Sequence, residues 1–409
     1  MPQSQSVLGN VTLGFEPLWN RWRSVCAYRL WADAPQNTAV DADHLLHAIS
    51  GCYRPSAPRP LLLHVRNPAL LHSLLDYPAT EGIWLCLHPS VLDDALLAGR
   101  VRSAHARGAT LVWHGEPGTS PHKDCAHLFA HQLRSLSPQE SLQALRVALR
   151  QHHDGGIANP ISSASPVHAA AIYEGLASPA LVEHALDRQH ATAVVGWPAE
   201  EVLHHYRYHQ LQPAHAITQA LVHALIDEVS LERIEQLLGQ DPLLTYRFLR
   251  WMNSAGLGLP RSIESVRQGL QVVGTSRLRE WLLAQLPHTS NDLNLAPVRF
   301  AMVLRARIME QLCEAGAEDA LRREVFLCGL FSQMDLLLGE TLGTAMARLP
   351  LSGRMESAIL GQTGPYAPWL EVATALESSH TGMIREVCRA HGMGLETVNR
   401  SLLRALAQA

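Results

Sequence analysis

Short, uniformly apolar segments recur in the first half of the chain and become rare in the second. Residues 60–65 read PLLLHV, residues 82–87 read GIWLCL and residues 109–113 read ATLVW. A strand that is buried on both faces, as in a parallel sheet, has this continuous apolar pattern. The segments between them, 68–75 and 90–106, have the character of helices. The alternation therefore predicts βα units and an α/β fold up to about residue 198.

The second half has the periodicity of helices instead. Asp241-Pro242 is a good helix start, since the Asp side chain accepts free amide hydrogens and Pro suits the first turn. Apolar residues then recur at helical spacing up to Met252, and Gly256 is a plausible stop. We expect a second helix from Ser262 to Gly274. Further helices are expected at about 276–286, 297–314, 319–338, 353–360, 366–378 and 395–408.

Length and composition limit the classes of protein that the chain can form. The 409 residues suit two domains, and 47% hydrophobic with 17% charged residues is a globular composition. The formal net charge is −4, and residues 1–200 carry 14 basic against 16 acidic side chains. Neither half has the basic excess that a nucleic acid or an anionic membrane selects. We therefore expect no nucleic-acid or membrane partner.

Cysteine usage and the N-terminus indicate the compartment. The seven cysteines are dispersed, and no pair has the Cys-x-x-Cys spacing of a zinc or redox site. The N-terminal MPQSQSVLGN lacks the apolar region of a signal peptide, and no run of about 18 apolar residues could span a bilayer. These features predict a cytoplasmic protein.

The segment DPLLTYRFLRWMNSAG, residues 241–256, resembles the HDOD family, the HD-related output domain. The Val-Val-Gly of residues 272–274 and the VFLCGLFSQMDLLLG of residues 325–339 extend the resemblance over roughly 205–390. Related HD-type phosphohydrolases hold metals with a His-Asp pair after Gly-Leu-Leu. Here Ser332-Gln333 follow Gly329-Leu330-Phe331, and neutral side chains are poor ligands for a catalytic divalent cation. The resemblance implies a binding module without the metal.

The first half resembles the EAL-type barrel, the cyclic di-GMP phosphodiesterase fold. The resemblance rests on Phe15-Glu16-Pro17-Leu18, the strand VCAYRLW at 25–31, IYEGLA at 172–177 and the closing Gly196-Trp197-Pro198. An active EAL site needs several oxygen ligands for two divalent metals. By this alignment the family's ligand positions carry Arg29 (or Tyr28, with a one-residue shift), His64, Cys86, Trp113 and His114, and only Glu174 remains acidic.

Several polar features have a structural and a functional interpretation. Arg29, Trp31 and Trp113 at the barrel mouth would suit phosphate pairing and stacking. Arg247 and Arg250 share a helix face that would suit an acidic partner, although solvated charge explains them equally well. Asn253-Ser254 is a candidate binding spot, but a helix-terminating turn is the better interpretation. His152-His153-Asp154 looks like an HD motif, but its glycine-flanked loop setting does not favour metal binding.

The sequence thus predicts an α/β plus all-α protein. Residues 1–200 are expected to form a degenerate EAL-like (β/α) barrel, either complete or truncated. Residues 201–409 are expected to form an all-helical HDOD domain. We expect a bacterial pseudoenzyme without cofactor or metal that acts in signal transduction through protein–protein interaction. Two alternatives remain: a catalytically dead cyclic di-GMP receptor, and a residual metal-dependent cyclic-dinucleotide phosphodiesterase.

Overall fold

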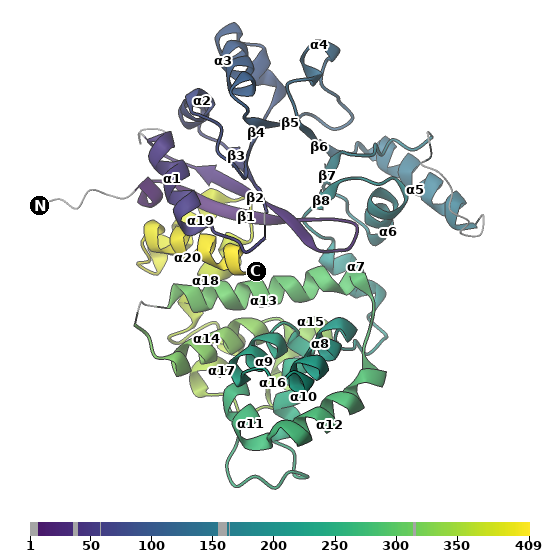
Figure 1. The fold of residues 1–409 in the computed structure, drawn as a ribbon, viewed down its shortest axis with the longest axis vertical. Coiled ribbons are helices and arrows are strands. Elements are labelled where there is room, and N and C mark those ends of the chain that lie inside the picture. The colour runs from purple at the N-terminus through teal and green to yellow at the C-terminus, as the bar shows by residue number, and fades with distance from the viewer. Residues whose placement is uncertain (1–6, 36–39, 58, 154–161, 163, 314–315) are drawn as a thin grey trace, which may run out of the picture. The chain divides into compact units, whose positions relative to one another are not determined.

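The computed structural model describes residues 7–35, 40–57, 59–153, 162, 164–313 and 316–409, apart from the side chains of 151–153. The chain forms two compact units (Figure 1). The first consists of Met1–Glu201 and Thr374–Gln408, and the second of Val202–Ala373 with Ala409. Among the described residues, no helix is both long and apolar enough to cross a membrane.

Eight strands of the first unit close into a barrel in chain order. The first strand is antiparallel to both of its neighbours, and all other neighbours are parallel. The fold class predicted for this half is confirmed, and the barrel is closed rather than truncated. The strands are β1 Thr12–Trp19, β2 Val25–Asp33, β3 Leu61–Val65, β4 Ile83–Leu87, β5 Thr110–His114, β6 His131–Ser135, β7 Ile172–Glu174 and β8 Ala193–Val195.

Helical segments follow most of these strands, as βα units require. Their starts are well encoded: Asn67 and Asp94 accept hydrogen bonds from the free amides of the helices that follow them. The segments are η1 Val7–Gly9, α1 Ala42–Cys52, α2 Pro68–Asp76, η2 Pro89–Leu92, α3 Ala95–Ala106, α4 Lys123–Ala126, α5 Pro138–His153, α6 Pro179–Glu183, η3 His184–Arg188 and α7 Ala199–His205.

The barrel interior is filled by side chains. One apolar cluster draws residues from all eight strands. Its members Leu62, Val112, Leu133 and Ile172 are inaccessible to solvent. Cys86 belongs to the same cluster and lies next to polar side chains described below. The barrel is therefore a packed core and not a pore.

The second unit is all-helical, as predicted. Its segments are α8 His215–Ile226, α9 Leu231–Leu238, α10 Pro242–Met252, α11 Val266–Val273, α12 Thr275–Gln285, η4 Leu286–His288, η5 Leu293–Leu295, α13 Ala296–Leu312, α14 Asp319–Phe331, α15 Met334–Leu338, α16 Leu342–Met346, α17 Gly353–Gly361 and α18 Ala367–Leu376.

Two predicted helices differ from the structure. The helix expected from Ser262 begins only after Ser265, whose side chain accepts a hydrogen bond from the Gln268 amide. Asn253 binds both the amide and the carbonyl of Ile263, so this residue has no backbone group free for an earlier helical turn. The helix expected over 319–338 is broken into α14 and α15 at 332–333.

The C-terminal helices of the chain fall in the first compact unit. Residues 374–408 belong to the barrel unit, where α19 (Thr381–Ala390) and α20 (Leu395–Gln408) lie beside β1 and α1 (Figure 1). Asn399 on α20 is fully buried and bonds to the Leu13 amide and to the Leu8 and Val11 carbonyls. These bonds join residues 386 to 391 positions apart, which local pattern cannot reveal.

Candidate functional site

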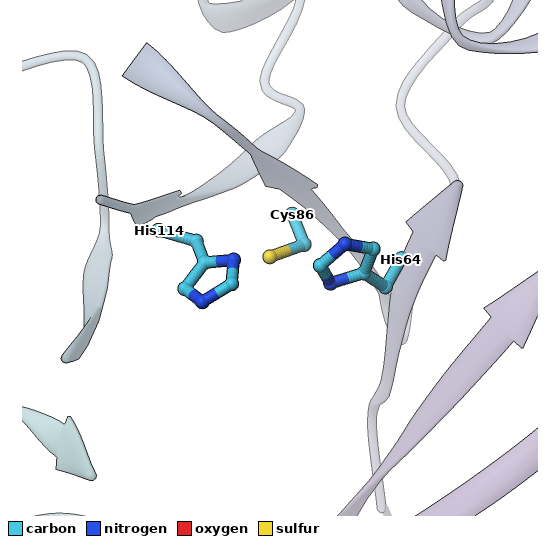
Figure 2. Close-up of side chains that lie close together, drawn as sticks. All are labelled: His64, Cys86 and His114. Atoms are coloured by element: carbon cyan, nitrogen blue, oxygen red, sulfur yellow. The ribbon is translucent and has the colours of Figure 1, made fainter. Parts of the chain in front are cut away.

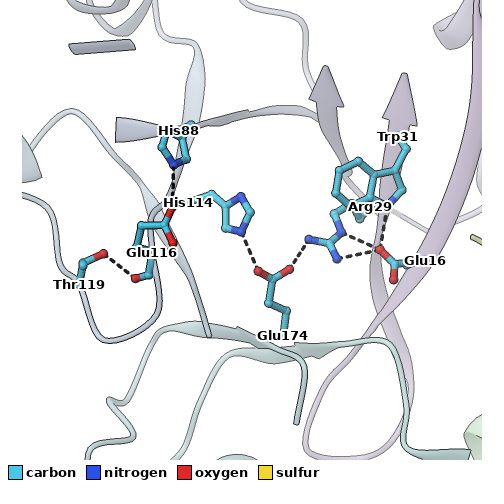
Figure 3. Close-up of polar contacts among 8 residues, drawn as sticks. All are labelled: Glu16, Arg29, Trp31, His88, His114, Glu116, Thr119 and Glu174. Carbon is cyan, nitrogen blue, oxygen red and sulfur yellow. Dashed lines mark hydrogen bonds and ion pairs between the residues drawn. The ribbon is translucent and has the colours of Figure 1, made fainter. Parts of the chain in front are cut away.

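A polar cluster lies inside the barrel towards the carboxyl ends of its strands. Arg29 comes from β2, His64 from β3, Cys86 from β4, His114 from β5 and Glu174 from β7. The alignment to EAL barrels assigned these positions to one site, and the structure brings the five side chains together (Figures 2 and 3). Side chains at this end of parallel barrel strands are placed for binding or chemistry.

Arg29 is the cation of this cluster and is almost fully buried. Its guanidinium contacts the Glu16 carboxylate at 2.7 Å and the Glu174 carboxylate at 2.6 Å (Figure 3). Burial alone would lower the pKa of Arg29, but the two carboxylates outweigh this effect and raise it. Arg29 is therefore a fixed charge that is already paired on two sides.

The residue that sequence reasoning missed is Glu16. It lies on β1 directly opposite Arg29 in the antiparallel pair, and its carboxylate also accepts a hydrogen bond from the Trp31 indole at 2.8 Å. The opposite charges on two neighbouring strands were a usable signal, because residues paired across an antiparallel ladder interact. The strand pairing itself, however, had to be known first.

Glu174 uses both of its oxygens. Oε2 accepts from Arg29 at 2.6 Å, and Oε1 lies 2.6 Å from His114 Nε2 (Figure 3). Burial would raise the pKa of Glu174, but the hydrogen bond from His114 and the charge of Arg29 hold it at about 2. The carboxylate is thus ionised and only accepts, so His114 Nε2 carries the hydrogen of this bond.

His64 and Cys86 complete the cluster (Figure 2). One ligand atom from each of His64, Cys86 and His114 lies within 4.8 Å of the other two. Burial, followed by the charges of His114 and Arg29, lowers the pKa of His64 to about 3, and burial raises the pKa of Cys86 to about 12. Without a bound cation these groups are therefore a neutral imidazole and a neutral thiol.

The two tryptophans proposed for stacking differ in their surroundings. Trp31 packs against the His64 ring at 3.9 Å between centroids and lies beneath the Arg29 guanidinium. Trp113 is only 2% exposed, and its ring lies where a β-carbon at Gly115 would be. In this structure Trp113 is a packing residue that offers no face to a ligand.

Most of the candidate binding residues in the helical unit make contacts within the fold. Asn253 donates to the Leu249 and Ile263 carbonyls and accepts from the Ile263 amide, so its side chain closes a turn. Arg247 donates to Gln212 and Gln285. Arg250 and Ser254 are exposed, and the Arg250 guanidinium lies 5.8 Å from the centroid of the Tyr246 ring.

The positions compared with an HD motif have structural surroundings. Ser332 donates to the Gly329 carbonyl at 2.8 Å and ends α14. His152 and His153 are the last residues of α5 instead of the loop that the sequence suggested, and Asp154 lies outside the described residues.

Comparison with known proteins identifies the helical unit: residues 211–349 are an HDOD domain. A curated relative is the cyclic di-GMP phosphodiesterase CdgJ of Vibrio cholerae serotype O1, 26% identical over 196 residues that cover 48% of this chain and 45% of the relative. Another is the uncharacterized protein YuxH of Bacillus subtilis, 25% identical over 164 residues that cover 38% of each. The chain spans less than half of the length of these relatives.

Solved structures show similarity at low identity. The MmoQ response regulator of Methylococcus capsulatus is 20% identical, with a TM-score of 0.38, and the match covers 47% of this chain and 98% of that one. A manganese and cyclic di-GMP complex of Klebsiella pneumoniae BlrP1 is 9% identical, with a TM-score of 0.30, and the match covers 48% of this chain and 56% of that one. The EAL enzyme Bd1971 in its cGMP-bound form is 9% identical, with a TM-score of 0.28, and the match covers 46% of this chain and 60% of that one.

Proposed function

We propose that this chain, an EAL-like barrel joined to an HDOD domain, is a non-catalytic protein of cyclic di-GMP signalling that acts by binding other proteins. The HDOD domain at residues 211–349 and the relative named a cyclic di-GMP phosphodiesterase support the signalling context. Loss of catalysis is the finer part of the proposal and rests on the barrel cluster.

The observation that carries this part is the pairing of Arg29. Hydrolysis of a phosphodiester by two hard divalent cations needs several free oxygen ligands. The two carboxylates of the cluster, Glu16 and Glu174, are both bound to the Arg29 guanidinium, and the second oxygen of Glu174 accepts from His114. Magnesium or manganese would have to displace a buried, charge-assisted network to use either carboxylate.

The same pairing weakens the alternative of a catalytically dead cyclic di-GMP receptor. A phosphate would have to compete with two carboxylates for Arg29, and Trp113 is buried. Arg250 on the HDOD domain, by contrast, is exposed, with its guanidinium over the Tyr246 ring, and this exposure makes it available to an acidic partner.

The catalytic question is tested with the purified full chain, cyclic di-GMP and either magnesium or manganese. Product formation is followed by chromatography beside an active EAL enzyme. We expect no hydrolysis above the buffer rate. Turnover that depends on the added metal would contradict the non-catalytic assignment. Calorimetry with the dinucleotide under the same conditions is expected to give no saturable heat, and a saturable signal would establish the receptor function instead.

Partner binding is tested with the full chain as bait in a bacterial lysate, followed by cross-linking and mass spectrometry. We expect an acidic protein to be captured by the wild type and lost with Arg250→Glu. Arg233→Glu is the matched control, because Arg233 is also exposed on the HDOD domain. Equal capture by both variants would argue against recognition through Arg250.

A further inference from the structure

We propose that His64, Cys86 and His114 bind a zinc ion inside the barrel. The three residues come from the successive parallel strands β3, β4 and β5, which place their side chains next to one another (Figure 2). Imidazole and thiolate are the ligands that zinc prefers in proteins. The proposal does not depend on the partner-binding function proposed above.

The spacing of the three side chains suits a tetrahedral ion. Their ligand atoms lie within 4.8 Å of one another. With zinc–nitrogen distances of about 2.0–2.1 Å and a zinc–sulfur distance of about 2.3 Å, ligand atoms at tetrahedral angles are about 3.4–3.6 Å apart. No separation therefore has to shorten by much more than about 1 Å, which a modest side-chain rotation achieves.

The orientation of His114 is already that of a metal ligand. Its Nε2–H is held by Glu174, so in the neutral ring that binds a metal the lone pair is on the second nitrogen, Nδ1. Figure 2 shows this nitrogen facing the Cys86 sulfur. A carboxylate that holds the far side of a histidine in this way fixes the ring and its tautomer in many zinc sites. Glu174 would thus act as a positioning residue.

His64 provides a second, independent observation. Its Nδ1 is buried and has no hydrogen-bond partner within the described part of the chain. Buried polar atoms are normally satisfied, and an orphan beside a thiol and a second imidazole is explained if a cation belongs there. The simpler alternative is that His64 and Cys86 only fill space in the barrel.

Charge in the cluster is compatible with a cation. Arg29 would repel it if unpaired, but Glu16 and Glu174 offset its charge. His64, Cys86 and His114 offer nitrogen and sulfur ligands and no carboxylate. Magnesium and manganese favour oxygen ligands, so they are not the ions that this set prefers. Three protein ligands leave a fourth position for water.

The test uses the full chain after removal of metals by chelator dialysis. Cobalt(II) serves as a spectroscopic substitute for zinc, because it gives visible bands of tetrahedral coordination and a thiolate charge-transfer band. We expect one equivalent of cobalt to bind with both signatures and one equivalent of zinc to abolish them. Cys86→Ala is expected to lose the thiolate band, whereas Cys125→Ala, which removes a cysteine outside the cluster, should keep it.

Two further variants make the test specific. His64→Ala should lose tetrahedral binding, and Glu174→Gln should weaken zinc affinity by about tenfold while keeping the bands, as expected for a positioning residue. Circular dichroism checks that each variant is folded. The proposal is overturned if wild-type protein gives no thiolate band, or if Cys86→Ala keeps it. Neither result bears on the hydrolysis assay above, so the two proposals fail separately.

Discussion

Replacement of Arg29 by Met should destabilise the barrel far more than loss of an ordinary ion pair. Met keeps most of the side-chain volume, so the change removes mainly the charge and its hydrogen bonds. Arg29 pairs with Glu16 at 2.7 Å and with Glu174 at 2.6 Å, and its side chain is 5% exposed. The variant would leave two half-buried carboxylates facing each other without a cation.

The magnitude follows from the burial of the partners. Breaking a buried pair costs about 3–5 kcal/mol. The Glu16 and Glu174 side chains are 28% and 20% exposed, so water reaches both, and the lower end of about 3 kcal/mol applies. For a unit of about 240 residues this corresponds to a fall of about 6–12 °C in the midpoint of thermal unfolding of the barrel.

The assay is calorimetry of the full chain, with Arg100→Met as the matched control. Arg100 pairs with Asp76 at 2.8 Å on the surface of the same unit, where the side chains are 33% and 54% exposed. Loss of such a pair costs at most about 1 kcal/mol. Adding Glu174→Gln to Arg29→Met should restore part of the lost stability, since it removes one unpaired charge. Equal effects of Arg29→Met and Arg100→Met would refute the reasoning.

Three other predictions test the packing of the chain. Asn399→Ala leaves one amide and two carbonyls without their buried partner, so unfolding should become easier by about 3 kcal/mol and the amide of Leu13 should exchange faster with deuterium. Gly14→Val should loosen the C-terminal segment and make it sensitive to protease, because a β-carbon there would overlap the Ser378 carbonyl; unchanged protection would disprove this contact. Burial raises the pKa of the Cys328 thiol to about 12, so in native protein at pH 8 it should react with a thiol reagent far more slowly than Cys125, and comparable rates in peptide mapping would contradict its burial.

Secondary structure was largely predictable because its signals are local. The apolar runs at 60–65, 82–87 and 109–113 correspond to β3, β4 and β5 within one residue at each end. The start of α10 follows from Asp241, whose side chain caps the helix as expected. The error at Ser262 arose because a distant side chain, Asn253, decides where α11 begins.

The candidate site was predictable only in part. Resemblance to a known barrel placed Arg29, His64, Cys86, His114 and Glu174 in one site. The prediction that this site holds no metal rested on its lack of carboxylates, and it did not consider histidine and cysteine as ligands for a different metal. The two histidines and the cysteine are about 22–28 positions apart in sequence, far from the short spacings by which zinc sites are recognised. Only closure of the barrel brings them together.

The sequence by itself determined the class of each half, because burial pattern and helix caps act over a few residues and do not depend on distant parts of the chain. It also excluded free oxygen ligands at most of the family's metal positions, since residue identity is enough for that. The tertiary structure alone decided that Glu16 neutralises Arg29, that His114 is oriented by Glu174, and that the last helix returns to the first strand. Such contacts depend on which strands and helices become neighbours, and this is set by the packing of the whole unit.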